Sequence, residues 1–149
     1  MDTIRFITNI EELDKKRSKI YIDHEFAFVL YKGEVRQYKL KIEQPIEEHI
    51  YSEIKNKILP KRAKKRCLNL LQKRPLTEYK LREKLKEGFY SEEIIEEAIL
   101  YVKSFHYVDD YQYARDYIEC YEGRKARKKV EAELLTKGIS KDILPSNQQ

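Results

Sequence analysis

The chain has 149 residues, of which 38% are charged and 41% are hydrophobic, with only four glycines and four prolines. Its length fits one domain or a short array of repeats, and the scarcity of helix breakers predicts a mainly helical protein. The net charge of +5 is compatible with an anionic partner but does not require one, and the apolar stretches are too short for a membrane span. The N-terminus lacks signal-peptide features, and Cys67 and Cys120 lack CxxC spacing, so we expect a cytoplasmic protein without a disulfide framework.

Short motifs of catalytic and cofactor sites are missing from the sequence. His24, His49 and His106 lie far apart and form no HExxH pattern, and the four isolated glycines form no phosphate-binding loop or GxSxG elbow. A site assembled from residues that are distant in the sequence is not ruled out by the absence of these motifs. We expect a protein that is not an enzyme and that binds neither a metal nor a cofactor.

The first 45 residues predict a small β element. Residues 20–22 and 25–30 are rich in β-branched and aromatic side chains, and Asp23 and His24 between them suit a two-residue turn. Residues 4–7 alternate and supply a candidate third strand. Because so small a sheet is marginally stable alone, we expect it to pack against the helices that follow.

Helical periodicity replaces this pattern after residue 45. Isoleucines recur every four residues from Ile46 to Ile58, which predicts a helix that starts at Pro45 and breaks at Pro60. Beyond that proline, an apolar row that begins with Ala63 predicts the next helix, whose opposite face is basic.

The following helices carry recognisable end signals. Thr77, Ser91 and Asp109 suit the N-cap position, Gly88 suits the C′ position that ends the first of these helices, and Gln112 suits a capping box with Asp109. The side chains that we expect to face inward are Cys67, Leu81, Leu85, Ile94, Ile95, Ala98, Ile99, Val102, Ala114, Tyr117, Ile118, Cys120 and Tyr121.

The last helical pattern runs from Ala126 to Gly138, and Ser140 suits the cap of a further helix that Pro145 stops. An offset of 49 residues aligns Ser91 with Ser140 and brings several apolar positions together, which suggests tandem three-helix units. We therefore predict an elongated array of about six helices. Its parts are a β element (1–45), a linking helix (46–59), a first three-helix repeat (60–106) and an incomplete second repeat (107–149).

Charge is distributed in blocks along the helical part. Residues 55–86 hold thirteen bases and two acids, residues 87–122 hold ten acids and two bases, and residues 124–129 hold five bases. A solvated helix surface accounts for single charges, but blocks this unbalanced favour a binding surface, and we expect the two basic zones to share one face. The acidic block suits either a helix N-terminus or a basic protein partner. The residues that we expect to bind a partner or DNA are Arg62, Lys64, Lys65, Arg66, Lys73, Arg74, Arg82, Arg124, Lys125, Arg127 and Lys128.

Several short runs, in their order and spacing over residues 4–144, resemble the RecX family of bacterial recombinase regulators. These runs are residues 20–28, 63–71, 74–78, 85–88, 90–95, 107–110 with 113–114, and 133–139. The chain departs from the family pattern at His24 and His106, where glycine is usual, and at Lys80, where glutamate is common. It also ends inside the second repeat, whereas family members usually carry three.

The resemblance implies a regulator without catalytic residues. RecX proteins bind RecA, lie in the groove of its filament on DNA, and inhibit its ATPase, strand exchange and co-protease activities, with consequences for recombination, repair and the SOS response. They also bind DNA weakly. We expect a monomeric cytoplasmic protein whose partners are the RecA filament and, largely without sequence preference, DNA. The alternative is a stand-alone helical transcription regulator, although no helix displays an evident set of base-reading side chains.

Overall fold

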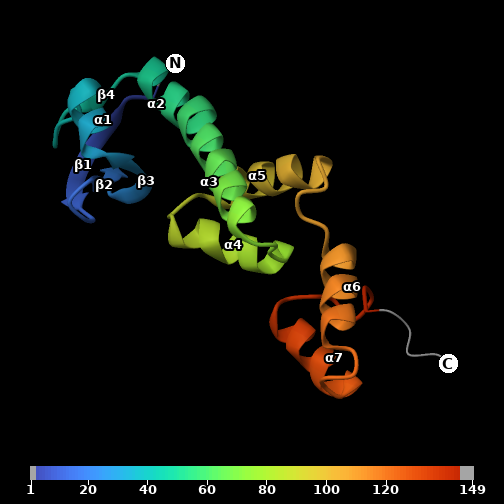
Figure 1. The fold of residues 1–149 in the computed structure, drawn as a ribbon. Coiled ribbons are helices and arrows are strands. Elements are labelled where there is room, and N and C mark those ends of the chain that lie inside the picture. The colour runs from blue at the N-terminus through green and yellow to red at the C-terminus, as the bar shows by residue number, and fades with distance from the viewer. Residues whose placement is uncertain (1–2, 145–149) are drawn as a thin grey trace.

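The computed structural model describes residues 3–144, which form an elongated array with the sheet at one end and the last two helices at the other (Figure 1). The sheet is followed by a long helical segment, two further helices packed on it, and then the terminal pair. The predicted class, mainly helical with a small N-terminal strand element, is confirmed.

Four antiparallel strands form the sheet in the order β3-β2-β1-β4. Their bounds are β1 Arg5–Glu12, β2 Arg17–Ile22, β3 Glu25–Tyr31 and β4 Pro45–Ile46. The predicted two-residue turn joins β2 to β3, with Asp23 and His24 at φ values of 50° and 70°. Both residues thus adopt the left-handed conformation that a tight hairpin turn requires, although neither is glycine. The predicted third strand is also present, as the much longer β1.

The predicted helix start at Pro45 is wrong. Pro45 and Ile46 pair with Phe6 and Arg5 as the short edge strand β4, and helix α2 (Glu48–Glu53) begins only after them. Ile46 is buried in the core, but it lies on a strand and not on the helical segment that contains the other isoleucines of the pattern. Proline suits this position because it has no N–H to leave unpaired on the open side of an edge strand. A short helix, α1 (Lys32–Gln37), also follows β3 and was not predicted.

The predicted break at Pro60 is wrong as well. Helix α2 continues through a π-helical turn, η1 (Ile54–Ile58), directly into α3 (Leu59–Lys73), so that Pro60 lies inside one continuous helical segment. The Leu59 N–H donates to the carbonyl of Ile54, five residues back. Proline lacks an N–H, and its ring clashes with the carbonyl four residues earlier in a regular helix. The wider turn immediately before Pro60 accommodates both effects.

The remaining helices are α4 (Glu78–Glu87), α5 (Glu92–Ser104), α6 (Asp110–Tyr121) and α7 (Arg127–Thr136). The predicted N-caps are confirmed, because side-chain oxygens of Thr77, Ser91 and Asp109 accept hydrogen bonds from backbone N–H groups of the first turn. These bonds satisfy donors that a helix start otherwise leaves free.

Three other end signals were misjudged. Gly88 has a φ of −86°, and the next residue, Phe89, takes the left-handed conformation at 66°. The Gln112 side chain donates to Asp116, so its capping box with Asp109 does not form. Ser140 accepts from Asp142 N–H in a turn rather than starting a helix, and Pro145 lies outside the described residues.

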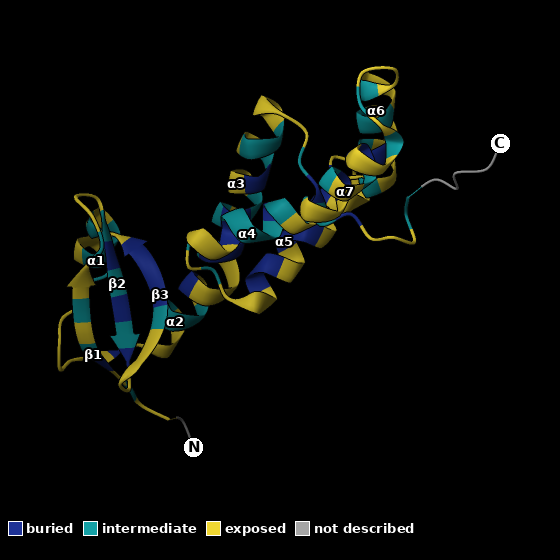
Figure 2. Cartoon of the chain, turned by 90° about the horizontal axis from the view of Figure 1, so that it is seen from below, coloured by how far each residue is buried: buried dark blue, intermediate teal, exposed yellow. Residues whose placement is uncertain are grey.

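One hydrophobic core runs from the sheet into α5, and a second, smaller one lies between α6 and α7 (Figure 2). Ile7, Ile20 and Leu30 of the sheet belong to the same cluster as Leu85 and Ile99 of the helices, all fully buried. The expected packing of the sheet on the helices is thereby observed. The smaller core consists of Ala114, Val130, Leu134 and Ile139, with Tyr117 and its neighbours at the margin.

The two cysteines differ in environment. Cys67 is fully buried on α3, as predicted, but Cys120 is exposed on the outer side of α6, so that part of the prediction is wrong. Burial raises the pKa of the Cys67 thiol to about 11.

We therefore predict that a disulfide exchange reagent at pH 8 labels one thiol rapidly and the second only after unfolding, because the thiolate is the reactive form. The Cys120→Ser variant should lose the fast phase, whereas Cys67→Ser should retain it. Rapid labelling of both thiols in the folded wild-type chain would contradict the burial of Cys67. The absorbance of the thiol that the reagent releases measures both phases.

Candidate interaction surface

Helix α3 carries apolar and basic side chains on opposite faces. Ala63 and Cys67 are fully buried against the core, whereas Lys61, Lys65 and Arg66 are exposed. This separation follows from helical periodicity, because residues three and four apart share a face. The exposed bases therefore form a row along the outer face of α3.

This row forms one wall of a cleft with a volume of about 1520 Å³. Strand β3 forms the opposite wall along its whole length, and the connection between α4 and α5 contributes Phe89 and Tyr90. Ten basic and four acidic residues line the cleft. An excess of one charge in a concave surface concentrates counter-ions, so the cleft is suited to an anionic ligand.

Most of these bases are free to meet a partner. Arg17 pairs with Asp14, Arg62 with Glu34, and Arg5 with Glu48. Seven lining bases have no acidic partner within ion-pair distance among residues 3–144, namely Lys15, Lys16, Lys55, Lys61, Lys65, Arg66 and Lys84.

Aromatic rings of the cleft are already covered by cations on one face. The Arg62 guanidinium lies 4.6 Å from the Tyr31 ring centre, that of Arg5 lies 4.0 Å from Tyr51, and the Lys19 ammonium lies 4.6 Å from Phe89. Such contacts contribute roughly 0.5–1 kcal/mol each at exposed sites. They hold the cations beside the cleft and occupy ring faces on which a ligand would otherwise stack.

Phe89 joins the hairpin to the first repeat. Its backbone is left-handed, which is unfavourable for a residue with a Cβ by roughly 1–2 kcal/mol. Its ring centre lies 6.1 Å from that of Phe26 on β3, and this contact, together with Lys19, helps to offset the strain. This lining residue of the cleft thus links two separate parts of the chain.

Three predicted binding residues, Arg62, Lys65 and Arg66, line the main cleft. Lys64 instead pairs with Glu97 at 2.9 Å and lies 5.1 Å from the Tyr101 ring, beside a smaller hollow of about 380 Å³. Lys73 and Arg74 are exposed where α3 ends.

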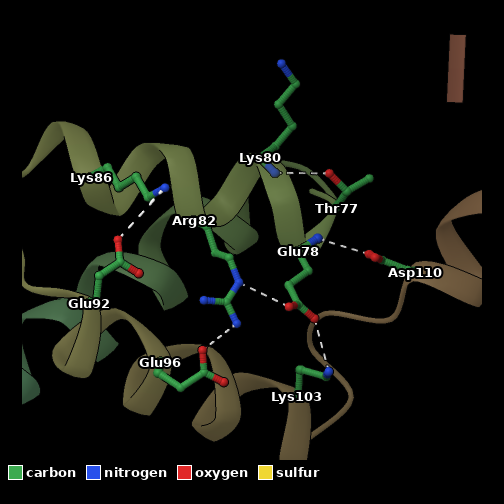
Figure 3. A network of polar contacts seen from close by, with 9 residues as sticks. All are labelled: Thr77, Glu78, Lys80, Arg82, Lys86, Glu92, Glu96, Lys103 and Asp110. Atoms are coloured by element: carbon green, nitrogen blue, oxygen red, sulfur yellow. Dashed lines mark hydrogen bonds and ion pairs between the residues drawn. The ribbon is translucent and has the colours of Figure 1, made fainter. Parts of the chain in front are cut away.

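Arg82 belongs to a structural network rather than to an open surface (Figure 3). Its guanidinium bridges Glu78 at 3.1 Å and Glu96 at 2.7 Å, and Glu78 also pairs with Lys103 at 3.0 Å. Burial alone would raise the pKa of Glu78, but the hydrogen bonds from Lys103 and Arg82 outweigh it and lower that pKa. The network ties α4 to α5, and the Glu78 N–H donates to Asp110 at the start of α6.

The acidic block has a corresponding internal role. Glu96 and Glu97 pair with bases of the first basic zone, and Glu92 approaches Lys86 at 3.9 Å. Glu92 and Glu93 also occupy the first turn of α5, where the helix dipole favours acids. The helix N-terminus and internal pairing account for these carboxylates.

The second basic zone lies at the far end of the molecule, around the connection from α6 to α7 (Figure 1). Lys125 pairs with Glu133 at 3.0 Å and covers the Tyr121 ring at 4.1 Å, and Arg127 pairs with Glu131. For Arg124 and Lys128, the described part of the chain supplies no ion-pair partner. That the two basic zones share one exposed face stays a prediction.

Seven of the ten bases of the cleft were not predicted as site residues; of these, Arg5 and Arg17 lie on β1 and β2, and Lys61 falls inside the first basic zone. Lys15 and Lys16 lie on the turn before β2, far in sequence from α3, while Lys55 and Lys84 fall inside the first basic zone. The run at residues 15–17 is visible in the sequence as a cluster of bases. Only the fold reveals that it lines the same cleft as Lys65.

Glu133 provides a pH-sensitive contact between α6 and α7. It accepts hydrogen bonds from the Tyr117 hydroxyl at 2.6 Å and the Lys125 ammonium at 3.0 Å, and these lower its pKa below the usual 4.5. A carboxyl whose pKa is depressed by folding stabilises the fold above its unfolded pKa and loses that contribution as pH falls through the folded value.

We therefore predict that the tyrosine near-ultraviolet circular dichroism signal of the α6–α7 pair weakens as the pH is lowered from 5 to 3. In the Glu133→Gln variant, the weakening of the signal that protonation of Glu133 causes should be absent. An identical pH profile for variant and wild type would mean that Glu133 does not couple the two helices.

Comparisons with known proteins find a matching family model, relatives in sequence and a solved structure with a similar fold. A family model described as the first three-helix domain of RecX matches residues 63–101, the region of α3 to α5. No helix in the described range is long and apolar enough to cross a membrane. A solved structure titled "Crystal structure of regulatory protein RecX" covers 93% of this chain with a TM-score of 0.58 and 26% identity, and 70% of that chain is matched.

Two relatives named "Regulatory protein RecX" show the same relationship in sequence. The protein from Caldanaerobacter subterraneus is 32% identical over 140 residues, which cover 93% of this chain and 71% of the relative. The one from Clostridium acetobutylicum is 31% identical over 140 residues, or 93% of this chain and 65% of the relative. The chain thus spans about two thirds of the length of these relatives. It belongs to the RecX family of regulatory proteins.

Proposed function

We propose that this protein binds RecA and RecA filaments on DNA, and that it regulates them mainly by inhibiting ATPase, strand exchange and co-protease activities. The family assignment supports a regulatory role. The observation that carries the proposal is the concentration around one cleft of seven bases that have no ion-pair partner within residues 3–144. The bases of the α4–α5 network, in contrast, are neutralised internally. A surface that keeps its charges free is suited to an anionic assembly such as a nucleoprotein filament.

Contacts with DNA would come from exposed bases that have no ion-pair partner within residues 3–144, such as Arg124 and Lys128 of the second basic zone. Lysine and arginine on helix faces meet phosphates without reading sequence, so such binding is weak and falls steeply as salt increases. In a random-sequence DNA selection we expect no preferred site that survives at high salt. Recovery of one would favour the alternative of a stand-alone transcription regulator.

The direct test is a charge reversal on the cleft wall. The Lys65→Glu/Arg66→Glu variant should need roughly tenfold more protein for half-inhibition of RecA's DNA-dependent ATPase, because it replaces attraction by repulsion at the contact. Both side chains are exposed, so the fold should change by no more than about 0.5 kcal/mol per substitution. Lys125 is unsuitable for this test because it pairs with Glu133.

A matched control carries the same change in net charge elsewhere. Lys41 and Lys141 are exposed and lie outside the cleft, so Lys41→Glu/Lys141→Glu should inhibit as the wild type does. Co-sedimentation with RecA filaments and circular dichroism complete the measurement. If the cleft variant is folded and inhibits as well as the control, the bases of α3 are only solvated surface.

A further inference from the structure

Strand β3 has no neighbouring strand on its outer edge. It is the terminal strand in the order β3-β2-β1-β4 and has seven residues, whereas the opposite edge strand β4 has two. Every residue of β3 lines the basic cleft. Proteins usually protect an edge of this length with lysine, proline or a covering element, because it can pair with another strand. Strand β3 contains neither lysine nor proline.

The hydrogen bonds at the end of β3 reveal which backbone groups face the cleft. Lys32 N–H donates to Lys16 in the ladder, whereas Tyr31 N–H donates to the Glu34 carboxylate on the open side. Because the direction alternates along an antiparallel strand, Leu30 N–H points into the ladder and Val29 N–H points away from it. A register shift near Ala27 leaves the following residues, up to Tyr31, regularly paired with β2.

The open edge already accommodates one carboxylate of the chain itself. One oxygen of Glu34 accepts from Tyr31 N–H at 2.8 Å, and the other is held by the Arg62 guanidinium, which covers the Tyr31 ring. An acidic side chain therefore fits against this edge with a backbone N–H on one side and an arginine on the other. Lys61, Lys65 and the remaining unpaired bases extend the same environment along the cleft.

The same features favour a peptide over a nucleic acid. Tyr31, Tyr51 and Phe89 already carry a cation on one ring face, which hinders the stacking of successive bases that single-strand binding requires. A free strand edge, in contrast, provides backbone hydrogen bonds that only a peptide in extended conformation can match.

We propose that the cleft binds an extended acidic segment of a partner protein, which adds to the sheet as a strand along residues 28–31 of β3. Its backbone pairs with outward groups such as Val29 N–H, and its carboxylates meet the unpaired bases of α3 and the turn before β2. This inference does not depend on RecA being that partner, and it is tested in the absence of RecA.

The probe is a labelled ten-residue peptide of alternating glutamate and valine, added to the full chain and followed by fluorescence anisotropy. Two altered peptides separate the contributions. One is N-methylated at alternate residues along one edge, which removes strand pairing while retaining every charge, and the other has lysine in place of glutamate. Both should bind at least tenfold more weakly than the parent peptide.

Amide hydrogen exchange locates the bound strand. Exchange at Val29 N–H should slow at least tenfold on addition of the peptide, whereas Leu30 N–H, already in the ladder, should change little. The Lys65→Glu/Lys84→Glu variant should lose peptide binding, and Lys128→Glu, outside the cleft, should keep it. These surface variants do not require the strand itself to be altered.

Three outcomes would overturn the proposal. The N-methylated peptide could bind as tightly as its parent, Val29 exchange could stay unchanged at saturating peptide, or single-stranded oligo(dT) could bind more tightly than the peptide at physiological salt. The last result would assign the cleft to nucleic acid. None of them bears on inhibition of the RecA ATPase, so the two proposals fail separately.

Discussion

Replacing Gly138 by alanine is expected to destabilise the chain by about 2–5 kcal/mol. Gly138 follows α7 with a φ of 89°, and a Cβ added there would lie 2.1 Å from the Cβ of Tyr79. The substitution therefore combines an unfavourable left-handed backbone with a collision against the first turn of α4. Since both partners belong to short, fixed segments, neither can move aside cheaply. Urea unfolding monitored by far-ultraviolet circular dichroism measures the change.

Gly123 supplies the matched control. Its φ of 79° is also left-handed, but no atom lies within 4 Å of an added Cβ. Gly123→Ala should therefore show the backbone penalty alone, roughly 1–2 kcal/mol. Equal losses for the two variants would show that close packing between Gly138 and Tyr79 contributes nothing to stability.

The second large effect is expected at Thr77, whose side chain is only 1% exposed. Its hydroxyl accepts from Lys80 N–H at 3.2 Å and donates to the carbonyl of Lys137 at 2.5 Å, which links the start of α4 to the end of α7. Thr77→Val keeps the shape but removes both bonds. The lost cap and the unsatisfied carbonyl together predict a loss of about 2–4 kcal/mol.

Thr77→Ser retains the hydroxyl and removes one methyl group, so it should lose only about 1 kcal/mol. Differential scanning calorimetry distinguishes the two, because 1 kcal/mol shifts the midpoint by about 2–4 °C in a chain of this size. If the serine variant is as unstable as the valine variant, packing of the methyl group rather than hydrogen bonding is what matters at this position.

Local signals predicted local structure well. The turn at Asp23 and His24 and the caps at Thr77, Ser91 and Asp109 depend on hydrogen bonds within a few residues, so each is visible in the sequence. Buried positions on α5 followed from helical periodicity for the same reason.

The errors arose where distant parts of the chain decide the conformation. Pro45 joins a strand because Phe6 offers an edge to pair with, and no helical pattern can reveal that partner. Phe89 takes the left-handed position beside Gly88 because its ring packs on Phe26, more than sixty residues away. Cys120 is exposed because the small core of α6 and α7 does not reach its side of the helix.

The candidate site was predicted only in part. Charge counting along the sequence identified the bases of α3, because Lys65 and Arg66 lie in an unbalanced block. It could not distinguish these bases from Arg82 and Lys125, whose charges are neutralised by carboxylates that folding brings beside them. Nor could it place Lys15 in the same cleft, since that placement depends on how the sheet packs against the helices.

The unbroken passage of the chain through Pro60 has a mechanical consequence. From Glu48 to Lys73 the backbone forms one rod, roughly 39 Å long at the usual rise per residue. This helical segment contains no internal loop, and residues of the shared core lie along its side. Bending is therefore expected further on, in the short connector between α5 and α6. The distance between the edge of strand β3 and the bases of α3 is therefore set by the continuous helix and the shared core.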